Sequence, residues 1–269
     1  MTAFPEDSFM ELEETIVSCA RMAREAQHGI RRMYKSDGSV LTETDMRISG
    51  IVEDRIRQLF PECGYVCEET PVRRIEGSQW TFILDPVDGT DVYSQGLPCW
   101  AVSLGILDSE RRPVGAVIAA PRFGIGQEEL LVSLCPGKRL RVDGAEFVPA
   151  DGKDEVEQVT VGSTDQATLD FSRFHGKVRT FGSSILHLIS PVVFPSIQGC
   201  INQPAYVWDM ASSHAVLLAA GMELVYADRS RFEYTDEILY GKKKYRMEVY
   251  AGSRRAVESL MESLPVRAL

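Results

Sequence analysis

Trp80-Thr81-Phe82-Ile83-Leu84-Asp85-Pro86-Val87-Asp88-Gly89-Thr90 is a short apolar run followed by an acidic turn. The run at residues 81–84 predicts a buried strand that ends at Asp85. Pro86 fixes its own φ, and Gly89 allows a tight turn and the close approach of a ligand. Two carboxylates this close at a strand end would repel each other unless a cation lay between them. Taken alone, the stretch therefore fits either an ordinary acidic turn or a metal site with oxygen ligands.

Acidic residues elsewhere in the chain favour the metal site. Glu68 and Glu69 follow a short apolar stretch, and Asp45 lies where a loop passes into a predicted helix. Trp208-Asp209 opens another predicted helix, where an Asp either caps the helix or holds a metal.

Hydrophobic periodicity predicts the elements around these residues. Helices are expected at residues 7–34, capped by Asp7 or Ser8, and at 44–60, with a break at 35–39. After the strand at 81–84, strands are expected at 101–107, 114–120 and 130–132.

A segment rich in Gly, Pro and charge at residues 136–155 predicts a boundary between two halves, residues 1–145 and 146–269. Strands in the second half are predicted at 158–161, 199–202, 223–226 and 248–251, and helices at 183–193, 209–220 and 254–264. This alternation, after helices and a strand meander in the first half, predicts a layered α/β (α+β) fold.

Composition excludes several classes of protein. The chain has 269 residues, of which 44% are hydrophobic and 25% charged, so it is globular and large enough for a sizeable core. A net charge of −10 argues against nucleic acid as a partner, because an acidic chain gains nothing from counterion release. The N-terminal residues 1–14 lack the apolar core of a signal peptide, and no stretch is apolar for long enough to span a membrane.

The six cysteines indicate reduced thiols in a cytoplasmic protein. Cys63 and Cys67 form the one close pair, and no second pair completes a zinc site. Cys67 and Cys99 lie near acidic candidates in the sequence, but nothing basic flanks them to lower a thiol pKa, so we assign both to packing.

These motifs together resemble the inositol monophosphatase family, phosphatases grouped with fructose bisphosphatases and phosphoadenosine phosphate phosphatases. The matching pieces run in the family's order over nearly the whole chain: Glu68-Glu69, residues 80–90, Trp208-Asp209-Met210-Ala211 and Ala220-Gly221. The resemblance implies an α-β-α-β-α layered sandwich whose two halves meet at the site. It also implies a Mg²⁺-dependent phosphomonoesterase with two or three Mg²⁺ ions, a small phosphomonoester as substrate, and a homodimer.

The resemblance also assigns roles to single residues. Glu68, Asp85 and the Val87 carbonyl would bind a first metal, and Asp85, Asp88 and Asp209 a second. Thr90 would position the attacking water with Asp45 behind it, and Glu68 is counted as catalytic through a third, weaker metal. The implied substrate-binding residues are Asp88, Gly89, Thr90, Gly182, Ser183, Asn202 and Asp209.

Substrate choice is where the sequence leaves the inositol pattern. Asn202 stands where inositol enzymes carry an acidic residue that contacts inositol hydroxyls, and Ile185 stands at a position that is usually small. His187 and Asn202 are therefore expected to line the pocket. Gly182-Ser183-Ser184 and Tyr234-Thr235 are similar to the phosphoadenosine phosphate phosphatases, although the lysine that usually follows the Gly-Ser-Ser of those enzymes is absent.

Two features allow a structural and a functional reading. Lys242-Lys243-Lys244 is either a solvated loop or a second anion contact at the pocket rim. His214 falls about 140° around the helix from Asp209, so a surface or core role is favoured over a ligand role.

Three functions remain open on these grounds. The first is an inositol-monophosphatase-like hydrolase for a phosphorylated polyol or sugar. The second is the same chemistry on phosphoadenosine phosphate or fructose bisphosphate. The third is a non-catalytic module that only binds phosphate or metal.

Overall fold

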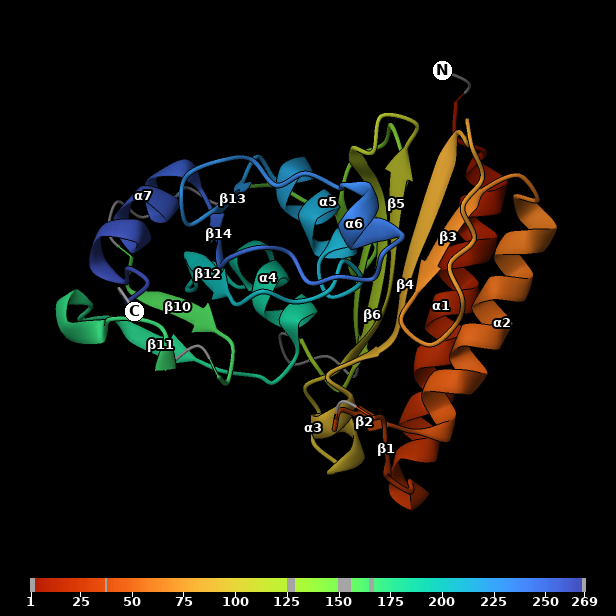
Figure 1. Cartoon of the computed structure of the whole chain (residues 1–269), viewed down its shortest axis with the longest axis horizontal. Coiled ribbons are helices and arrows are strands. Elements are labelled where there is room, and N and C mark those ends of the chain that lie inside the picture. The colour runs from red at the N-terminus through yellow and green to blue at the C-terminus, as the bar shows by residue number, and fades with distance from the viewer. Residues whose placement is uncertain (1–2, 37, 125–128, 150–155, 165–166, 268–269) are drawn as a thin grey trace.

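The computed structural model describes residues 3–36, 38–124, 129–149, 156–164 and 167–267. Within them the elements form five layers in the order α-β-α-β-α (Figure 1). The layered sandwich expected from the sequence is therefore confirmed.

The larger sheet has seven strands in the described part of the chain. In spatial order they are β3 (Gly64–Cys67), β4 (Trp80–Asp88), β5 (Ala101–Asp108), β6 (Pro113–Pro121), β7 (Glu129–Leu134), β8 (Arg141–Val142) and β9 (Ala145–Glu146). β3 and β4 run parallel, and the other neighbouring pairs are antiparallel. β4, β5 and β6 read as nearly continuous apolar runs because helices cover both faces of the sheet.

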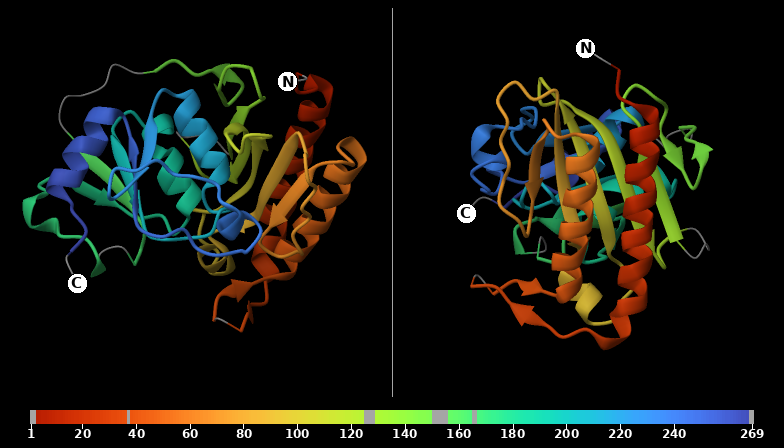
Figure 2. Two further views of the ribbon diagram at one scale, coloured as in Figure 1. Left: turned by 45° about the horizontal axis from the view of Figure 1, so that its top comes forward. Right: turned by 90° about the vertical axis from the view of Figure 1, so that its right-hand side faces the viewer.

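Two long helices cover the outer face of this sheet (Figure 2, right). α1 (Glu6–Ala26) packs on β5 and β6, and α2 (Glu43–Leu59) packs on β4 and on α1. Their inward faces bury side chains such as Leu12, Ile16 and Ile48 in one cluster with the strands beneath.

The helix predicted at residues 7–34 was too long. α1 ends at Ala26, a 3₁₀ turn η1 (Gln27–Gly29) follows, and β1 (Met33–Tyr34) pairs with β2 (Val40–Leu41) in a hairpin. The buried Gln27 side chain donates to the carbonyls of Tyr93 and Leu97 at 3.0 and 2.9 Å, and this tertiary contact redirects the chain. The predicted cap was also wrong, because Pro5 holds the N-cap position and makes no side-chain hydrogen bond.

The middle layer consists of α4 (Ser184–Val193) and α5 (Ala211–Ala219), which lie between the two sheets. α5 packs on β5 and β6, α4 packs on the smaller sheet, and the two helices contact each other. Both are apolar over most of their surface because neighbours surround them. The short helices α3 (Thr90–Ser94) and α6 (Asp236–Leu239) were not predicted.

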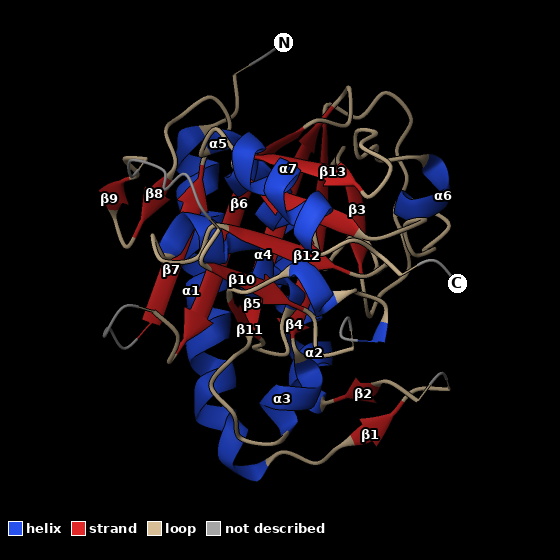
Figure 3. Cartoon of the chain, turned by 90° about the vertical axis from the view of Figure 1, so that its left-hand side faces the viewer, coloured by secondary structure: helices blue, strands red, loops and turns tan. Residues whose placement is uncertain are grey.

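The smaller sheet has five strands among the described residues. In spatial order they are β11 (Lys177–Arg179), β10 (Gln158–Val161), β12 (Gly199–Asn202), β14 (Val249–Gly252) and β13 (Glu223–Tyr226), with a 3₁₀ turn η3 (Phe171–Arg173) nearby in the chain. α7 (Arg254–Ser263) packs on β12 and β14 and forms the last layer (Figure 3). No helix in the described ranges is both long enough and apolar enough to cross a membrane.

Candidate metal centre

Three aspartates from both halves of the chain come together at the end of β4. Asp85 and Asp88 belong to β4, and Asp209 comes two residues before α5. One carboxylate oxygen from each lies within 4.8 Å of the others. Asp85 and Asp88 are buried, and Asp209 keeps partial exposure. The resulting donor set consists of oxygen atoms only.

An irregularity in β4 allows this convergence. Residues three apart in a regular strand point to opposite faces of the sheet. The pairing of β4 with β5 shifts between Asp85 and Asp88, so both carboxylates can serve one site. Gly89 then adopts φ +86°, and a Cβ there would lie 3.1 Å from the Gly182 carbonyl oxygen. The Gly in the acidic turn is therefore required both by its backbone angle and by the close approach of the second half.

Burial and mutual repulsion make the three carboxylates costly to ionise in the absence of a cation. Burial, followed by the charges of Glu68, Asp88 and Asp209, raises the pKa of Asp85 well above its usual range. Burial, followed by the charge of Asp88, does the same to the pKa of Asp209. A hard cation would neutralise this cluster, and carboxylate oxygens are the ligands that Mg²⁺ and Ca²⁺ prefer. The donor set thus fits the metal that the sequence implies.

Asp88 also connects the two halves. Its carboxylate accepts hydrogen bonds from the Ser183 hydroxyl, from the Ser184 amide at 3.2 Å and from the Ile185 amide at 2.9 Å. These donors come from the first turn of α4, which favours a nearby negative charge. Burial still outweighs them and raises the pKa of Asp88 to about 6.

Glu68 lines the same cavity but lies outside the three-aspartate cluster. The Lys35 ammonium bridges Glu68 and Glu69, with 2.6 Å to a carboxylate oxygen of each. Burial raises the pKa of Glu68 to about 7, although Lys35 acts in the opposite direction. Lys35 was not among the predicted site residues, because its segment was interpreted only as a helix break.

Thr90 and Asp45 lie together beside this cluster. Thr90 Oγ1 lies 2.8 Å from the Val87 carbonyl oxygen and 3.2 Å from Asp45 Oδ1. Asp45 is fully buried in the first turn of α2, where the Thr42 amide and hydroxyl both donate to it. Burial is the main cause that raises the pKa of Asp45 to about 6. The capping box thus fixes the carboxylate that faces Thr90.

The cavity around the cluster has a volume of about 480 Å³. Besides the three aspartates and Glu68, it is lined by Arg32, Tyr34, Gly38, Ser39, Val40, Val87, Gly89, Thr90, Asp91, Gly182 and Ser184. Gly182 has φ +84°, and a Cβ there would lie 2.5 Å from Val92 Cγ1. The contact between the acidic turn and the segment before α4 therefore has a glycine on each side, Gly89 and Gly182.

A second cavity of about 330 Å³ adjoins the first and shares Asp91, Gly182 and Ser184 with it. Ser183, His187 and Asn202 line it, as the sequence suggested. Ile185 does not line this cavity, because its side chain is fully buried in the core and Ser184 faces the cavity. The first turn of α4 buries Ile185 in the middle layer, which a single-residue comparison could not reveal.

Lys242 departs from the prediction that the basic run is a solvated loop. Its ammonium donates to the carbonyls of Glu68 and Thr70 at 3.0 and 2.9 Å and lies 5.4 Å from the centre of the Trp208 ring. Lys243 and Lys244 do fit that prediction, because both are exposed, and Lys243 pairs with Glu237. The role of Lys242 was missed because three adjacent lysines give no sign of which one is buried.

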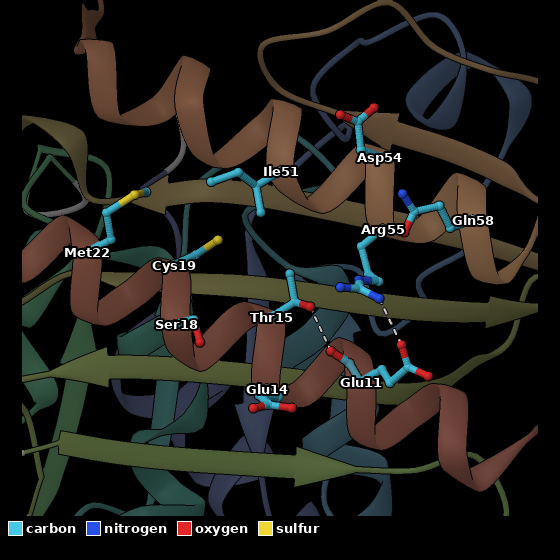
Figure 4. Close-up of a pocket in the computed structure, with 10 residues that line it drawn as sticks. All are labelled: Glu11, Glu14, Thr15, Ser18, Cys19, Met22, Ile51, Asp54, Arg55 and Gln58. Atoms are coloured by element: carbon cyan, nitrogen blue, oxygen red, sulfur yellow. Dashed lines mark hydrogen bonds and ion pairs between the residues drawn. The ribbon is translucent and has the colours of Figure 1, made fainter.

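Two other features are separate from the metal centre. His214 is buried and its Nδ1 lies 3.0 Å from the Tyr234 hydroxyl, so of the surface and core roles predicted for it, it has the core role. A cavity of about 590 Å³ lies on α1 and α2, and the Arg55–Glu11 ion pair at 2.8 Å crosses it. Figure 4 shows the residues that line this cavity. It shares no lining residue with the acidic cavity.

Comparisons with known proteins agree with this geometry. The sequence model described as the inositol monophosphatase family matches residues 9–259. The 3'(2'),5'-bisphosphate nucleotidase CysQ of Escherichia coli K12 is 22% identical over 251 residues, 86% of this chain and 98% of the relative. Human inositol monophosphatase 2 is 25% identical over 241 residues, 80% of this chain and 79% of the relative.

Solved structures show the same fold. An inositol monophosphatase of Thermotoga maritima has a TM-score of 0.75 at 16% identity, with 93% of this chain and 94% of that chain covered. The extragenic suppressor protein suhB of Bartonella henselae has a TM-score of 0.74 at 20% identity, with 94% and 97% covered. The relatives belong to a class of metal-dependent phosphatases, and the buried carboxylates at the end of β4 agree with that class. Within that class, the chain belongs to the inositol monophosphatase family.

Proposed function

We propose that this protein is a Mg²⁺-dependent phosphomonoesterase that hydrolyses a small phosphorylated molecule. The observation that carries the proposal is the cluster of Asp85, Asp88 and Asp209, whose oxygens lie within 4.8 Å of one another. The ionised carboxylates of such a cluster repel one another, and a bound hard cation reduces this repulsion. Glu68 in the same cavity adds a fourth carboxylate.

Bound Mg²⁺ would be held by Glu68, Asp85, the Val87 carbonyl, Asp88 and Asp209, and would supply neutralising charge for the phosphoryl oxygens. The residues of the chain set the direction of attack. The Thr90 hydroxyl hydrogen has acceptors at Val87 O and Asp45 Oδ1, so the oxygen lone pairs are available to a water in the cavity. Thr90 would orient this water for attack on phosphorus, and the water proton would pass through the hydroxyl to the buried Asp45 as the new phosphorus–oxygen bond forms. The ester bond would break on the opposite side, and the leaving alkoxide would take up a proton from solvent water.

Gly89, Thr90, Gly182, Ser183 and Asn202 complete the proposed substrate contacts. Gly89 and Gly182 keep the cavity wall thin where a phosphoryl group would lie. Asn202 faces the adjoining cavity, where a leaving alcohol would extend. The amide can both donate to and accept from hydroxyl groups.

The test is phosphate release from a panel of small phosphomonoesters with purified protein. We expect turnover of at least one compound with Mg²⁺ and its loss in excess chelator. Absence of turnover for every compound, combined with tight binding of one of them, would instead support the non-catalytic module. Full activity in chelator would refute the metal assignment.

A second candidate differs only in the substrate. Hydrolysis of a nucleoside bisphosphate is favoured by the neutral Asn202 and by the resemblance of Gly182-Ser183-Ser184 to phosphoadenosine phosphate phosphatases. CysQ, one of the relatives, is a bisphosphate nucleotidase. Rates on inositol phosphate, phosphoadenosine phosphate and fructose bisphosphate would decide between these substrates. The division at residue 145, a homodimer and a cytoplasmic location stay predictions.

A further inference from the structure

The adjoining cavity of about 330 Å³ contains a cation that the reaction described above does not use. Lys244 lines this cavity, together with the loop at Ser163 and Thr164 and with Asn202 and Gln203. The acidic cavity next to it does not include Lys244. The two spaces meet at Gly182 and Ser184, so a molecule whose phosphoryl group lies among the aspartates can extend its leaving group toward Lys244.

The backbone beside Lys244 is held firmly. The neighbouring Tyr245 is buried, its amide donates to the Ala205 carbonyl at 3.0 Å, and its hydroxyl donates to the Gln203 carbonyl. The Lys244 ammonium lies 5.5 Å from the centre of the Tyr206 ring, which in turn stacks on Trp208. The Lys244 side chain is exposed, so its ammonium lies at the solvent-facing rim of the cavity, on a backbone that these contacts hold in place.

No carboxylate in the described part of the chain lies within ion-pair distance of Lys244, whereas Lys243 pairs with Glu237. The cavity does contain one acid, Asp91, but its carboxylate is engaged by Gln95 at 2.9 Å and by Arg32 at 3.6 Å. Asn202 adds no negative charge. The charge of Lys244 also acts on the Asp209 carboxylate, which Mg²⁺ would neutralise. With the metal bound, the cation at this rim favours an anion over a neutral polyol.

The remaining wall supplies neutral hydrogen-bonding groups. Gln203 holds the opposite loop through its amide, which donates to the Thr164 carbonyl and the Thr168 hydroxyl. His187 accepts the Phe181 amide at Nε2, so its neutral ring carries hydrogen at Nδ1, and that buried atom has no acceptor among the described residues. A cation flanked by neutral polar groups is the usual composition of an anion subsite.

We propose that this adjoining cavity binds a second anionic group, a phosphate or a carboxylate, on the leaving group of the substrate, with Lys244 as its counter-ion. The proposal rests on the phosphatase function proposed above and narrows its substrate class. A leaving group with a second anion would gain affinity from Lys244, and a plain polyol would not.

Paired substrates test this inference. Adenosine 3',5'-bisphosphate against adenosine 3'-monophosphate isolates a second phosphate, and 3-phosphoglycerate against glycerol 3-phosphate isolates a carboxylate. We expect kcat/KM to be about tenfold higher for the compound with the second anionic group in at least one pair. The pair that shows the preference identifies which anion the cavity accepts. Equal kcat/KM within both pairs would overturn the proposal.

Adjacent lysines provide a matched control. Within each pair, the preference ratio is kcat/KM for the compound with the second anionic group divided by kcat/KM for the compound without it. Lys244→Met should bring this ratio close to one, mainly by raising KM for the compound with the second anionic group. Lys243→Met removes the same charge one residue away and should keep the wild-type ratio. A wild-type ratio retained in Lys244→Met would also overturn the assignment. If no compound is turned over, the phosphatase proposal fails by itself, and the ratio of dissociation constants by calorimetry with Mg²⁺ tests the subsite in the same three proteins.

Discussion

At the scale of single residues, Asp88 combines two tasks. It offers an oxygen to the three-aspartate cluster, and it accepts the hydroxyl of Ser183 and the amides of Ser184 and Ile185. The same carboxylate thus connects the acidic turn to the middle helical layer. Its negative charge would bind the cation, and its two oxygens accept hydrogen bonds at the start of α4.

Asp88→Asn separates these two tasks. The amide oxygen can still accept from Ser183 and Ile185, although the NH2 group would then face the Ser184 amide. The negative charge is lost, so turnover should fall at least about 100-fold with a much smaller loss of stability. Phosphate release and thermal unfolding measure the two effects. Asp54→Asn, on α2 and away from the acidic cavity, is the control and should behave like the wild type. Wild-type turnover in Asp88→Asn would contradict the metal assignment.

Lys242 is a positioning residue, since it holds the Glu68–Thr70 backbone and lies over the Trp208 ring next to Asp209. Lys242→Met should raise the Mg²⁺ concentration for half-maximal activity by about tenfold, because partners behind metal ligands tune affinity. Lys242→Arg should restore part of the loss and Lys243→Met should cause none. An unchanged Mg²⁺ requirement in Lys242→Met would exclude this role.

At the scale of elements, the site depends on two turns that only glycine accommodates. Gly89 follows β4 and Gly182 precedes α4, and both have positive φ. They bring the two halves into contact beside Val92. The metal site therefore requires these turns as much as it requires the carboxylates.

Gly182→Ala should lower the free energy of unfolding by about 2 kcal/mol or more, because its Cβ would lie 2.5 Å from Val92 and its φ is +84°. Gly50→Ala is the matched comparison. Gly50 lies in α2, and a Cβ added there would meet no atom within 4 Å, so alanine should stabilise the protein by about 1 kcal/mol. Urea unfolding measures both, and equal effects at the two positions would contradict the steric argument.

An element could be predicted from the sequence where residues close in the chain determine it, and could not where distant residues do. The strand around 81–84 and the strands at 101–107 and 114–120 were found because continuous apolar runs mark strands buried on both faces. The end of the first helix was misplaced because Gln27 responds to the carbonyls of Tyr93 and Leu97, which no local pattern encodes. The roles of Lys35 and Lys242 were not predicted for the same reason, because their hydrogen-bond partners are distant in sequence.

At the scale of the whole molecule, the acidic centre links stability to pH and to cations. Burial raises the pKa of Asp88 to about 6 and the pKa of Glu68 to about 7, so the folded chain holds protons that the unfolded chain has released. This contribution to stability is complete below the ordinary carboxyl pKa of about 4 and is lost as the pH rises through about 6 to 7. A cation would replace the protons at neutral pH.

Mg²⁺ should therefore raise the Tm of the chelator-treated protein more at about pH 7.5 than at about pH 5, where protons compete for the same oxygens. Differential scanning calorimetry with Mg²⁺, and with NaCl at matched ionic strength, measures the effect. Asp88→Asn should reduce the shift at the higher pH. Equal shifts at both pH values would show that Mg²⁺ acts elsewhere.

The division of ligands between the halves also has a kinetic consequence. Asp85 and Asp88 come from a strand that pairs with its neighbour in the chain, whereas Asp209 comes from the segment before α5, in the middle helical layer. We expect the complete set of ligands to form only when this layer has packed, after the folding barrier has been crossed. Mg²⁺ should slow the unfolding of this protein and leave the rate of its refolding almost unchanged.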